Sequence, residues 1–129
     1  MKKNDHPKAR VFKSSWFTKA AKKARISDEA LCKAIQQVMQ GQADDLGGGV
    51  FKKRLNENKH RSIILAKSGN YWVYEFLFAK KDLDNIDDSE LITFRSLAKA
   101  YANLSEKQID QLLQEKLFVE ICHERKTSV

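Results

Sequence analysis

The sequence predicts an α+β domain, in which an antiparallel sheet follows an N-terminal helical hairpin and precedes C-terminal helices. Three observations predict this class. Apolar residues repeat at helical spacing over residues 15–39, strand-like runs separated by polar turns occupy residues 50–78, and helical spacing returns after residue 88. Helices that precede and follow a run of strands, rather than alternating with it, are typical of α+β folds.

The N-terminal part is expected to contain a short strand and two helices. Residues 10–13 can form the strand, and Ser14 or Ser15 caps a helix near residues 15–24. A second helix begins at Ser27 and ends before Gly41, which suits the position after a helix end. The first helix has an apolar stripe of Trp16, Phe17, Ala20, Ala21 and Ala24, with Lys19, Lys22 and Lys23 on the opposite face.

The middle of the chain predicts three strands in an antiparallel meander. The strands cover residues 50–55, 61–66 and 71–78, joined by short polar turns. Residues 44–49, two aspartates followed by Leu46 and three glycines, are expected to form a flexible loop. A phosphate-binding loop is excluded there, because the glycines lead from a helix into a strand and no Gly-Lys-Ser/Thr follows.

The last third predicts two helices and a final strand. Ser89 can cap a helix that runs to about residue 103, and Ser105 with Gln108 forms a capping box for the next helix. The strand covers residues 117–121. We therefore expect one domain over residues 10–122, a flexible basic tail over residues 1–9 and a polar tail over residues 123–129.

Composition excludes several classes of function. There is no run of about 18 apolar residues for a membrane span, and no apolar segment follows the basic N-terminus, so we expect an unprocessed cytoplasmic protein without a membrane partner. Cys32 and Cys122 lie 90 residues apart and are expected to be buried small hydrophobes in a reducing compartment, rather than a disulfide or a nucleophile. No metal or cofactor is expected, since the spacing of His6, His60 and His123 does not suit a metal site.

Positive charge is concentrated in two blocks. The formal net charge is +7, but residues 1–25 hold nine Lys or Arg against one acid, and residues 51–81 hold eight against two. The intervening residues 26–50 and the C-terminal residues 82–129 are net acidic. A localised positive surface of this kind favours a polyanionic partner.

The second basic block can form a phosphate-binding site. Strand alternation places Lys52 and Arg54 on one face, and Arg61 begins the adjacent strand, where we expect an exposed guanidinium aimed at a phosphate. Such cations can bind a phosphodiester and stabilise the extra negative charge of its transition state. A histidine can transfer a proton near neutral pH. Residues expected to join the cluster are Lys59, His60, Lys80 and Lys81. A solvated strand face is the alternative that this pattern leaves open.

Several segments resemble one family. Residues 46–55 (LGGGVFKKRL) and 76–86 (FLFAKKDLDNI) are similar to the RelE-like, HigB-type toxins of bacterial toxin–antitoxin systems, and the resemblance extends over residues 10–121. The lead-in segments 16–21 (WFTKAA) and 26–31 (ISDEAL), and LAKAY at 97–101, fit the same subgroup. The resemblance implies a RelE-like α+β fold and metal-independent cleavage of mRNA, commonly on the ribosome. The reaction expected for such cleavage is attack of the RNA 2′-hydroxyl on its neighbouring phosphate, which leaves a 2′,3′-cyclic phosphate.

The resemblance also implies site residues. The family pattern matches Lys52, Arg54, Arg61 and Lys81, and together with His60 of the basic cluster these form the expected catalytic set. The residues expected to bind RNA beside them are Lys53, Lys59, Tyr71, Tyr74 and Lys80. Two departures from the family pattern stand out. Lys81 occupies a position where arginine is usual, and Asp87 stands where a tyrosine is usual, so its role is left to His60, Tyr71 or Tyr74.

The same resemblance leaves other functions open. ParE-type toxins are similar in fold but inhibit DNA gyrase, and a nucleic-acid-binding protein without catalysis is a further alternative. Lys52, Arg54 and Arg61 favour the ribonuclease. The implied partner is a cognate antitoxin, expected to be of helix-turn-helix type. We expect the lysines of the first helix to meet its acidic residues.

Overall fold

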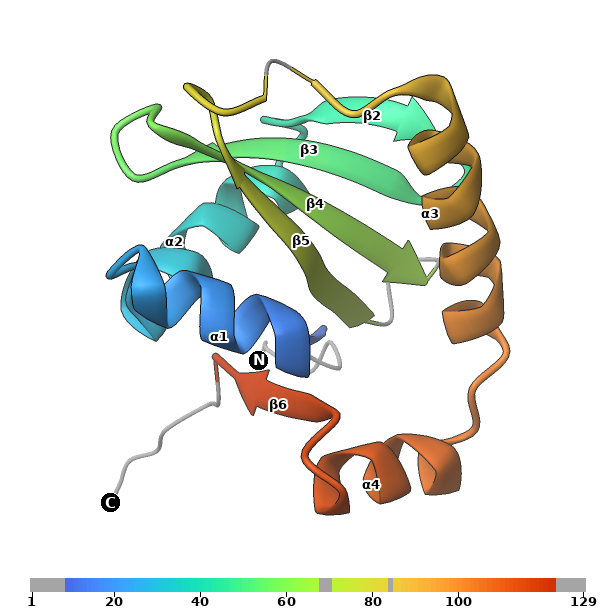
Figure 1. The fold of residues 1–129 in the computed structure, drawn as a ribbon. Helices are drawn as coiled ribbons and strands as arrows, with labels where there is room; N and C mark the ends of the chain where they lie inside the picture. Colours follow the sequence, from blue (N-terminus) through green and yellow to red (C-terminus); the bar gives the residue numbers. More distant parts are fainter. Residues whose placement is uncertain (1–8, 68–70, 84, 123–129) are drawn as a thin grey trace, which may run out of the picture.

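A six-stranded sheet with the order β2-β3-β4-β5-β1-β6 organises the computed structural model, which describes residues 9–67, 71–83 and 85–122 (Figure 1). The helices are α1 (Ser15–Lys23), α2 (Asp28–Met39), α3 (Asp88–Ala102) and α4 (Glu106–Gln114). The strands are β1 (Arg10–Ser14), β2 (Asp44–Gly47), β3 (Val50–Leu55), β4 (His60–Lys67), β5 (Tyr71–Ala79) and β6 (Phe118–Ile121). The α+β class is confirmed. The expected tails lie outside the described residues, apart from Ala9.

The sheet is mixed rather than wholly antiparallel. Strands β3, β4 and β5 form the predicted antiparallel meander, whereas β1 pairs in parallel with β5, placing Phe12 opposite Val73. β6 adds to β1 in antiparallel fashion. The chain leaves β1 through the α1–α2 hairpin and re-enters the sheet at β2, on the far edge, so β1 is left beside the last strand of the meander.

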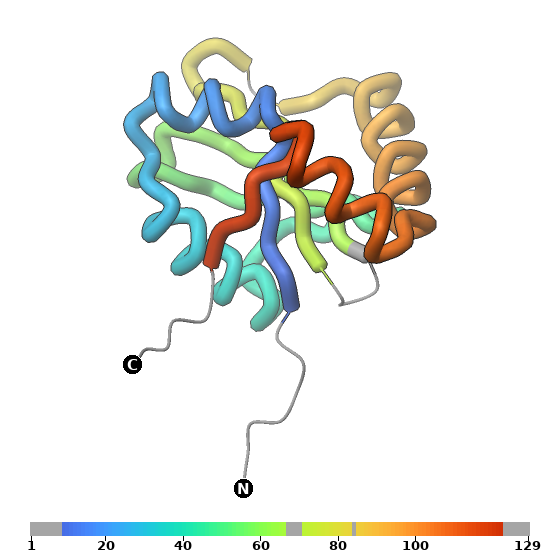
Figure 2. Tube along the Cα trace, turned by 90° about the horizontal axis from the view of Figure 1, so that it is seen from below, coloured from blue at the N-terminus to red at the C-terminus, as the bar shows by residue number. Residues whose placement is uncertain are grey.

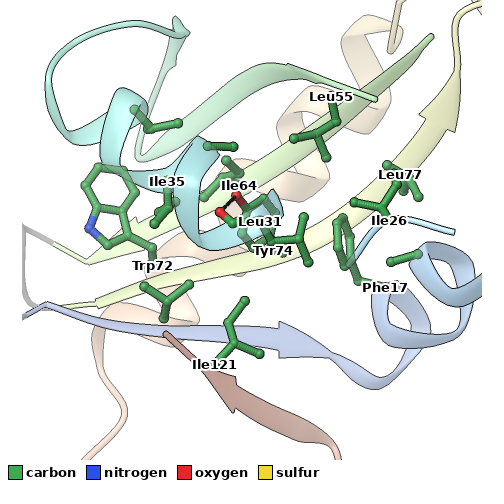
Figure 3. Packing of buried hydrophobic residues seen from close by; sticks show 14 residues of the cluster. Phe17, Ile26, Leu31, Ile35, Leu55, Ile64, Trp72, Tyr74, Leu77 and Ile121 are labelled. Carbon is green, nitrogen blue, oxygen red and sulfur yellow. Dashed lines mark hydrogen bonds between the residues drawn. The ribbon is translucent and has the colours of Figure 1, made fainter. Parts of the chain in front are cut away.

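Two helices pack on each face of the sheet, α1 and α2 on one and α3 and α4 on the other, and the two perpendicular views show their arrangement (Figures 1 and 2). α1 and α2 pack on one face, where Phe17, Leu31 and Tyr74 belong to one buried cluster. The Tyr74 ring lies 5.0 Å from that of Phe17, and its hydroxyl donates to the Leu31 carbonyl over 2.7 Å (Figure 3). α3 packs on the opposite face, against Val50 and other residues. α4 covers the end of that face near β1 and β6.

Side-chain caps set the helix starts. Ser14, Ser27 and Ser105 cap α1, α2 and α4 as predicted, each accepting a hydrogen bond from a backbone N–H in the first turn. α3 starts two residues earlier than expected, because Asp87 rather than Ser89 is its N-cap. The Asp87 carboxylate accepts from the Glu90 backbone, and the Glu90 side chain accepts from the Asp87 N–H, so the capping box forms at this register.

The segment expected to be a flexible loop is partly a strand. Asp44–Gly47 forms β2, which pairs with β3 through a tight turn. Gly48 has φ +65, and a Cβ at this position would lie 2.8 Å from Cγ of Arg95 on α3. Arg95 also donates hydrogen bonds to the carbonyls of Leu46 and Gly47. The glycines therefore let the hairpin pass under α3, which the local sequence did not indicate.

The two cysteines are bonded to each other, so the prediction of free buried thiols is wrong. Cys32 on α2 and Cys122, directly after β6, form a disulfide across 90 residues of sequence. Cys122 is exposed and Cys32 is half-buried. Their separation along the chain gives no sign of this contact, which forms because β6 lies at the edge beside β1 and its end reaches α2.

Candidate nucleic-acid interface

Three cations share one face of the sheet at the open end of the meander. Arg54 of β3 is the direct cross-strand partner of Arg61 of β4, and Lys52 is the partner of Ile63. Directly paired residues point to the same face, and Ile63 belongs to the cluster that α3 covers. Lys52, Arg54 and Arg61, named here the cationic row, therefore lie on the α3 face.

Arg61 is anchored within the β3–β4 turn. Only 9% of the residue is exposed, and its Nη1 donates to the carbonyls of Asn58 at 3.0 Å and His60 at 3.2 Å. Asn56, Glu57 and Asn58 all have positive φ, between 55 and 72, which makes this turn tight. The expectation of an exposed guanidinium is thus wrong, because the turn carbonyls hold it. No ion pair from Arg61 to an acid occurs among the described residues.

Lys52 and Arg54 have different environments. The Lys52 ammonium lies 3.3 Å from Oδ1 of Asn85 and 3.7 Å from Oδ2 of Asp44, and 17% of its side chain is exposed. It is therefore held between β2 and the segment that connects β5 to α3. Arg54 is exposed and makes no hydrogen bond or ion pair within the described parts of the chain. The row thus offers one free guanidinium beside two positioned cations.

Four aromatic rings continue this face beyond the cationic row. Phe78 is in register with Arg61, and Phe76 with Ile63. Phe76 is 6.0 Å from Phe78 and 5.7 Å from Phe94 of α3, measured between ring centroids, and Trp16 stacks on Phe76 at 4.9 Å with an interplanar angle of 24°. Trp16, Phe76, Phe78 and Phe94 are named here the aromatic floor. Trp16 is 51% exposed, so its predicted place in the apolar core stripe of α1 is wrong.

His60 and the second group of lysines lie elsewhere. His60 is paired with Leu55 and Ala79, and Leu55 packs with α1 and α2, so the imidazole points to the face opposite Arg61. Nδ1 of His60 is 3.1 Å from Nδ2 of Asn56. His60 lines an open cavity of about 730 Å³ at the ends of the strands, together with Asn58, Lys59, Ala79, Lys80 and Lys81. The predicted catalytic set is therefore divided. Lys52, Arg54 and Arg61 lie on the α3 face, whereas His60 and Lys81 line this cavity, which is named here the rim of the site.

Three predicted RNA-binding residues do not face this site. Lys53 points to the α1–α2 side, where its ammonium donates to the Gln42 carbonyl over 3.0 Å. Burial, and then the charge of Arg54, lower the pKa of Lys53. Tyr71 and Tyr74 are 3% and 0% exposed, and each hydroxyl donates to a backbone carbonyl. Burial raises the pKa of both. Tyr71 and Tyr74 lie on opposite faces of β5, and because helices cover both faces, both rings belong to the core.

The position at which the family resemblance implies a tyrosine has a structural use. Asp87 caps α3, and hydrogen bonds from the Glu90 backbone and the Ser89 hydroxyl lower the pKa of its carboxyl group. Sequence reasoning missed Asn85 and the aromatic floor. Alternation along β5 could have placed Phe76 and Phe78 on one face, but nothing in the sequence connected Asn85 with Lys52, 33 residues earlier.

The described residues form neither a metal-binding group nor a membrane-spanning helix. Within the described parts of the chain, no three His, Cys, Asp or Glu side chains gather as a metal-binding group. None of the helices described there has the length and apolar character needed to cross a membrane.

Comparison with known proteins identifies the family. The comparison with curated proteins gives no matching relative. The family model described as the RelE toxin of the RelE/RelB toxin–antitoxin system matches residues 9–121, which is most of the chain and includes the whole cationic row and aromatic floor. The chain therefore belongs to the RelE toxin family.

Proposed function

We propose that this RelE-family toxin is an endoribonuclease that cleaves mRNA and thereby arrests translation. The observation that supports the proposal best is the cationic row. It places two guanidinium groups and one ammonium on a single face, next to aromatic rings. Cations bind the phosphates of a polynucleotide and aromatic rings stack on its bases.

The proposed reaction uses the RNA's own 2′-hydroxyl. Its oxygen attacks the adjacent phosphorus, the bond from phosphorus to the 5′-oxygen breaks, and the products carry a 2′,3′-cyclic phosphate and a free 5′-hydroxyl. The proton of the 2′-hydroxyl passes to a base, and the departing oxygen receives a proton. Lys52, Arg54 and Arg61 stabilise the added negative charge on the phosphorane, as positioned donors do at other oxyanions. The mechanism needs no metal, because these cations supply the charge.

Proton transfer is assigned to the rim of the site. His60 and Lys81 line the same cavity at the ends of the strands, and Lys59 and Lys80 beside them are proposed to hold the RNA backbone. The His60 side chain points to the face opposite that of Arg61, so it can act only on an RNA strand that passes around the N-terminal end of β4. Lys81, in the turn after β5, has no such restriction.

The biological setting is part of the proposal. A toxin of this family has an antitoxin partner, and we propose an antitoxin of helix-turn-helix type, cleavage on the ribosome in the cytoplasm, and membership in the HigB-type subgroup. The motifs at residues 46–55 and 76–86 support the subgroup.

The test is a translating extract to which the purified chain is added. We expect mRNA fragments that end in a 2′,3′-cyclic phosphate, and no cleavage where the scissile nucleotide is replaced by its 2′-deoxy form. Equal cleavage of naked and ribosome-bound mRNA would remove the ribosome from the proposal. Intact mRNA together with inhibited gyrase supercoiling would contradict the ribonuclease and favour a ParE-like activity.

A further inference from the structure

An exposed stripe on α1 combines one aromatic ring with several lysines. Trp16, Lys19 and Lys23 are three, then four, residues apart and so lie on one side of the helix. A surface cavity of about 480 Å³ is lined by Trp16, Lys19, Ala20, Lys22 and Lys23, which together are named here the α1 stripe. Tryptophan at 51% exposure in a first helical turn has no role in the core.

The α1 stripe contacts the aromatic floor, which adjoins the cationic row. Trp16 stacks on Phe76, and Phe76 lies in the same cross-strand line as Ile63 and Lys52. Neighbouring strands are about 4.8 Å apart, so the backbones of Lys52 and Phe76 lie about 10 Å apart, a distance that a few nucleotides can span, with the buried Ile63 between them. The register of β1 explains why the indole reaches this surface, since β1 pairs with β5 only as far as Lys13 and Tyr74.

The charge of the α1 stripe has no protein partner in the described residues. The ion pairs found there involve Arg10, Lys13 and Lys52, and none involves a lysine of α1. The first turn of α1 also holds no acidic residue. An acidic peptide would satisfy the lysines, but it would leave unexplained an open indole face that extends the aromatic floor. A base on that face and phosphates beside the lysines satisfy both features.

We propose that the α1 stripe is a second RNA-binding segment, which stacks one base of single-stranded RNA on Trp16 and holds the adjoining phosphates with Lys19 and Lys23. The RNA then extends from the cationic row across Phe76 onto α1. This inference rests on the proposed ribonuclease function, and it extends the substrate contact beyond the nucleotide that is cleaved.

The test measures binding of fully 2′-O-methylated RNA, which cannot attack its own phosphates, at lengths of about 4 and 12 nucleotides. The parent should bind the longer RNA more tightly, and Trp16→Ala should weaken that binding by about 5- to 100-fold, the usual effect of removing one stacking ring. Met39→Ala is the matched control, because Met39 is 44% exposed at the far end of α2. The control should bind like the parent.

The lysines are tested with equal net charge. Lys19→Ala/Lys23→Ala should lose more affinity than Lys33→Ala/Lys107→Ala, whose exposed lysines lie on α2 and α4. A Trp72→Phe background leaves Trp16 as the sole tryptophan, and its fluorescence should be quenched by RNA. Unchanged fluorescence, or Trp16→Ala within about twofold of the parent, overturns the inference.

Two further outcomes are distinguished. If the α1 variants lose binding to polyglutamate but keep RNA binding, the α1 stripe is an acidic-protein surface and the inference is wrong. If the parent binds RNA through Trp16 but cleaves no mRNA in the translating extract, the proposed ribonuclease fails while the RNA contact stands. If the parent cleaves mRNA and Trp16→Ala binds RNA as tightly as the parent, this inference is overturned while the proposed ribonuclease stands.

Discussion

Arg54 of β3 and Arg61 of β4 are direct cross-strand partners, so two guanidinium groups originate side by side on one face of the sheet. Like charges in this position destabilise an antiparallel pair by up to about 1 kcal/mol. The carboxylate of Asp44 lies 3.7 Å from the Lys52 ammonium, and no described ion pair joins an acid to either arginine. Under the proposed function, a bound phosphate would neutralise the arginine pair and so offset this cost in stability.

Arg54→Gln should therefore separate activity from stability. Removing the exposed charge relieves the repulsion from Arg61, so the melting temperature should stay the same or rise. Cleavage should fall by about 10- to 100-fold, since a phosphate loses one cationic contact. Melting curves and cleavage rates are measured on the same preparations. A variant that melts earlier and cleaves at the parent rate would identify Arg54 as a structural residue.

Arg61→Ala should reduce both cleavage and stability. The guanidinium is buried and donates to the carbonyls of Asn58 and His60, so its loss should cost about 1–3 kcal/mol of unfolding free energy. Cleavage should drop by about 10²- to 10³-fold at a temperature where the variant is folded. Arg61→Lys should recover part of the activity, because the charge returns without the forked geometry.

Leu55→Ala provides the control for Arg61. Leu55 is 6% exposed and lies at the same end of the hairpin, but on the opposite face. It should lose about 2–5 kcal/mol and still cleave RNA when folded. If both variants lose the same fraction of activity, the effect of Arg61 is one of stability alone.

Glu75→Gln should change the pH dependence of stability. Burial raises the pKa of Glu75 above 4.5, although a hydrogen bond from the Tyr101 hydroxyl opposes the shift. The folded state therefore favours the protonated acid, and the stability it contributes is lost as the pH rises through the folded pKa. The melting temperature of the glutamine variant, relative to the parent, should be higher at pH 8 than at pH 4. An equal difference at both pH values would show that Glu75 folds without a shift.

Reduction should destabilise the chain. The Cys32–Cys122 disulfide ties the end of β6 to α2 and closes a loop of about 90 residues, for which the chain-entropy estimate is about 4–5 kcal/mol. Dithiothreitol should lower the melting temperature of the parent, but not that of Cys32→Ser/Cys122→Ser. A parent that melts at the same temperature with and without the reductant would show that the bond does not form in solution.

Much of the fold was predictable because local signals and tertiary packing agree. Alternation of side chains along β3 to β5, and serine caps before α1, α2 and α4, located these elements within one or two residues. The parallel pairing of β1 with β5 was not predictable, since it depends on a partner about 60 residues away. The same limit hid the disulfide and β2, whose contacts are also distant or made against α3.

The site was predictable only in part. Period-two alternation places Lys52 and Arg54 on one face, and in the structure Arg54 pairs with Arg61 across the turn. The same alternation, applied to His60 and Lys53, would have placed them on the other face. Trp16 was assigned to the core because its spacing fits the apolar stripe of α1, and only the end of β1 shows that this ring lies outside it.

One pair of neighbouring residues shows whether the α3 face, and not the α1–α2 face, carries the activity. Lys52 and Lys53 are adjacent in β3 and point to opposite faces. Both are changed to methionine, and the rate of mRNA cleavage is measured in the translating extract with the amounts of folded protein matched. Lys52→Met should lose about 10²-fold or more in rate, and Lys53→Met should stay within about threefold of the parent. Equal losses, or a larger loss for Lys53→Met, would contradict it.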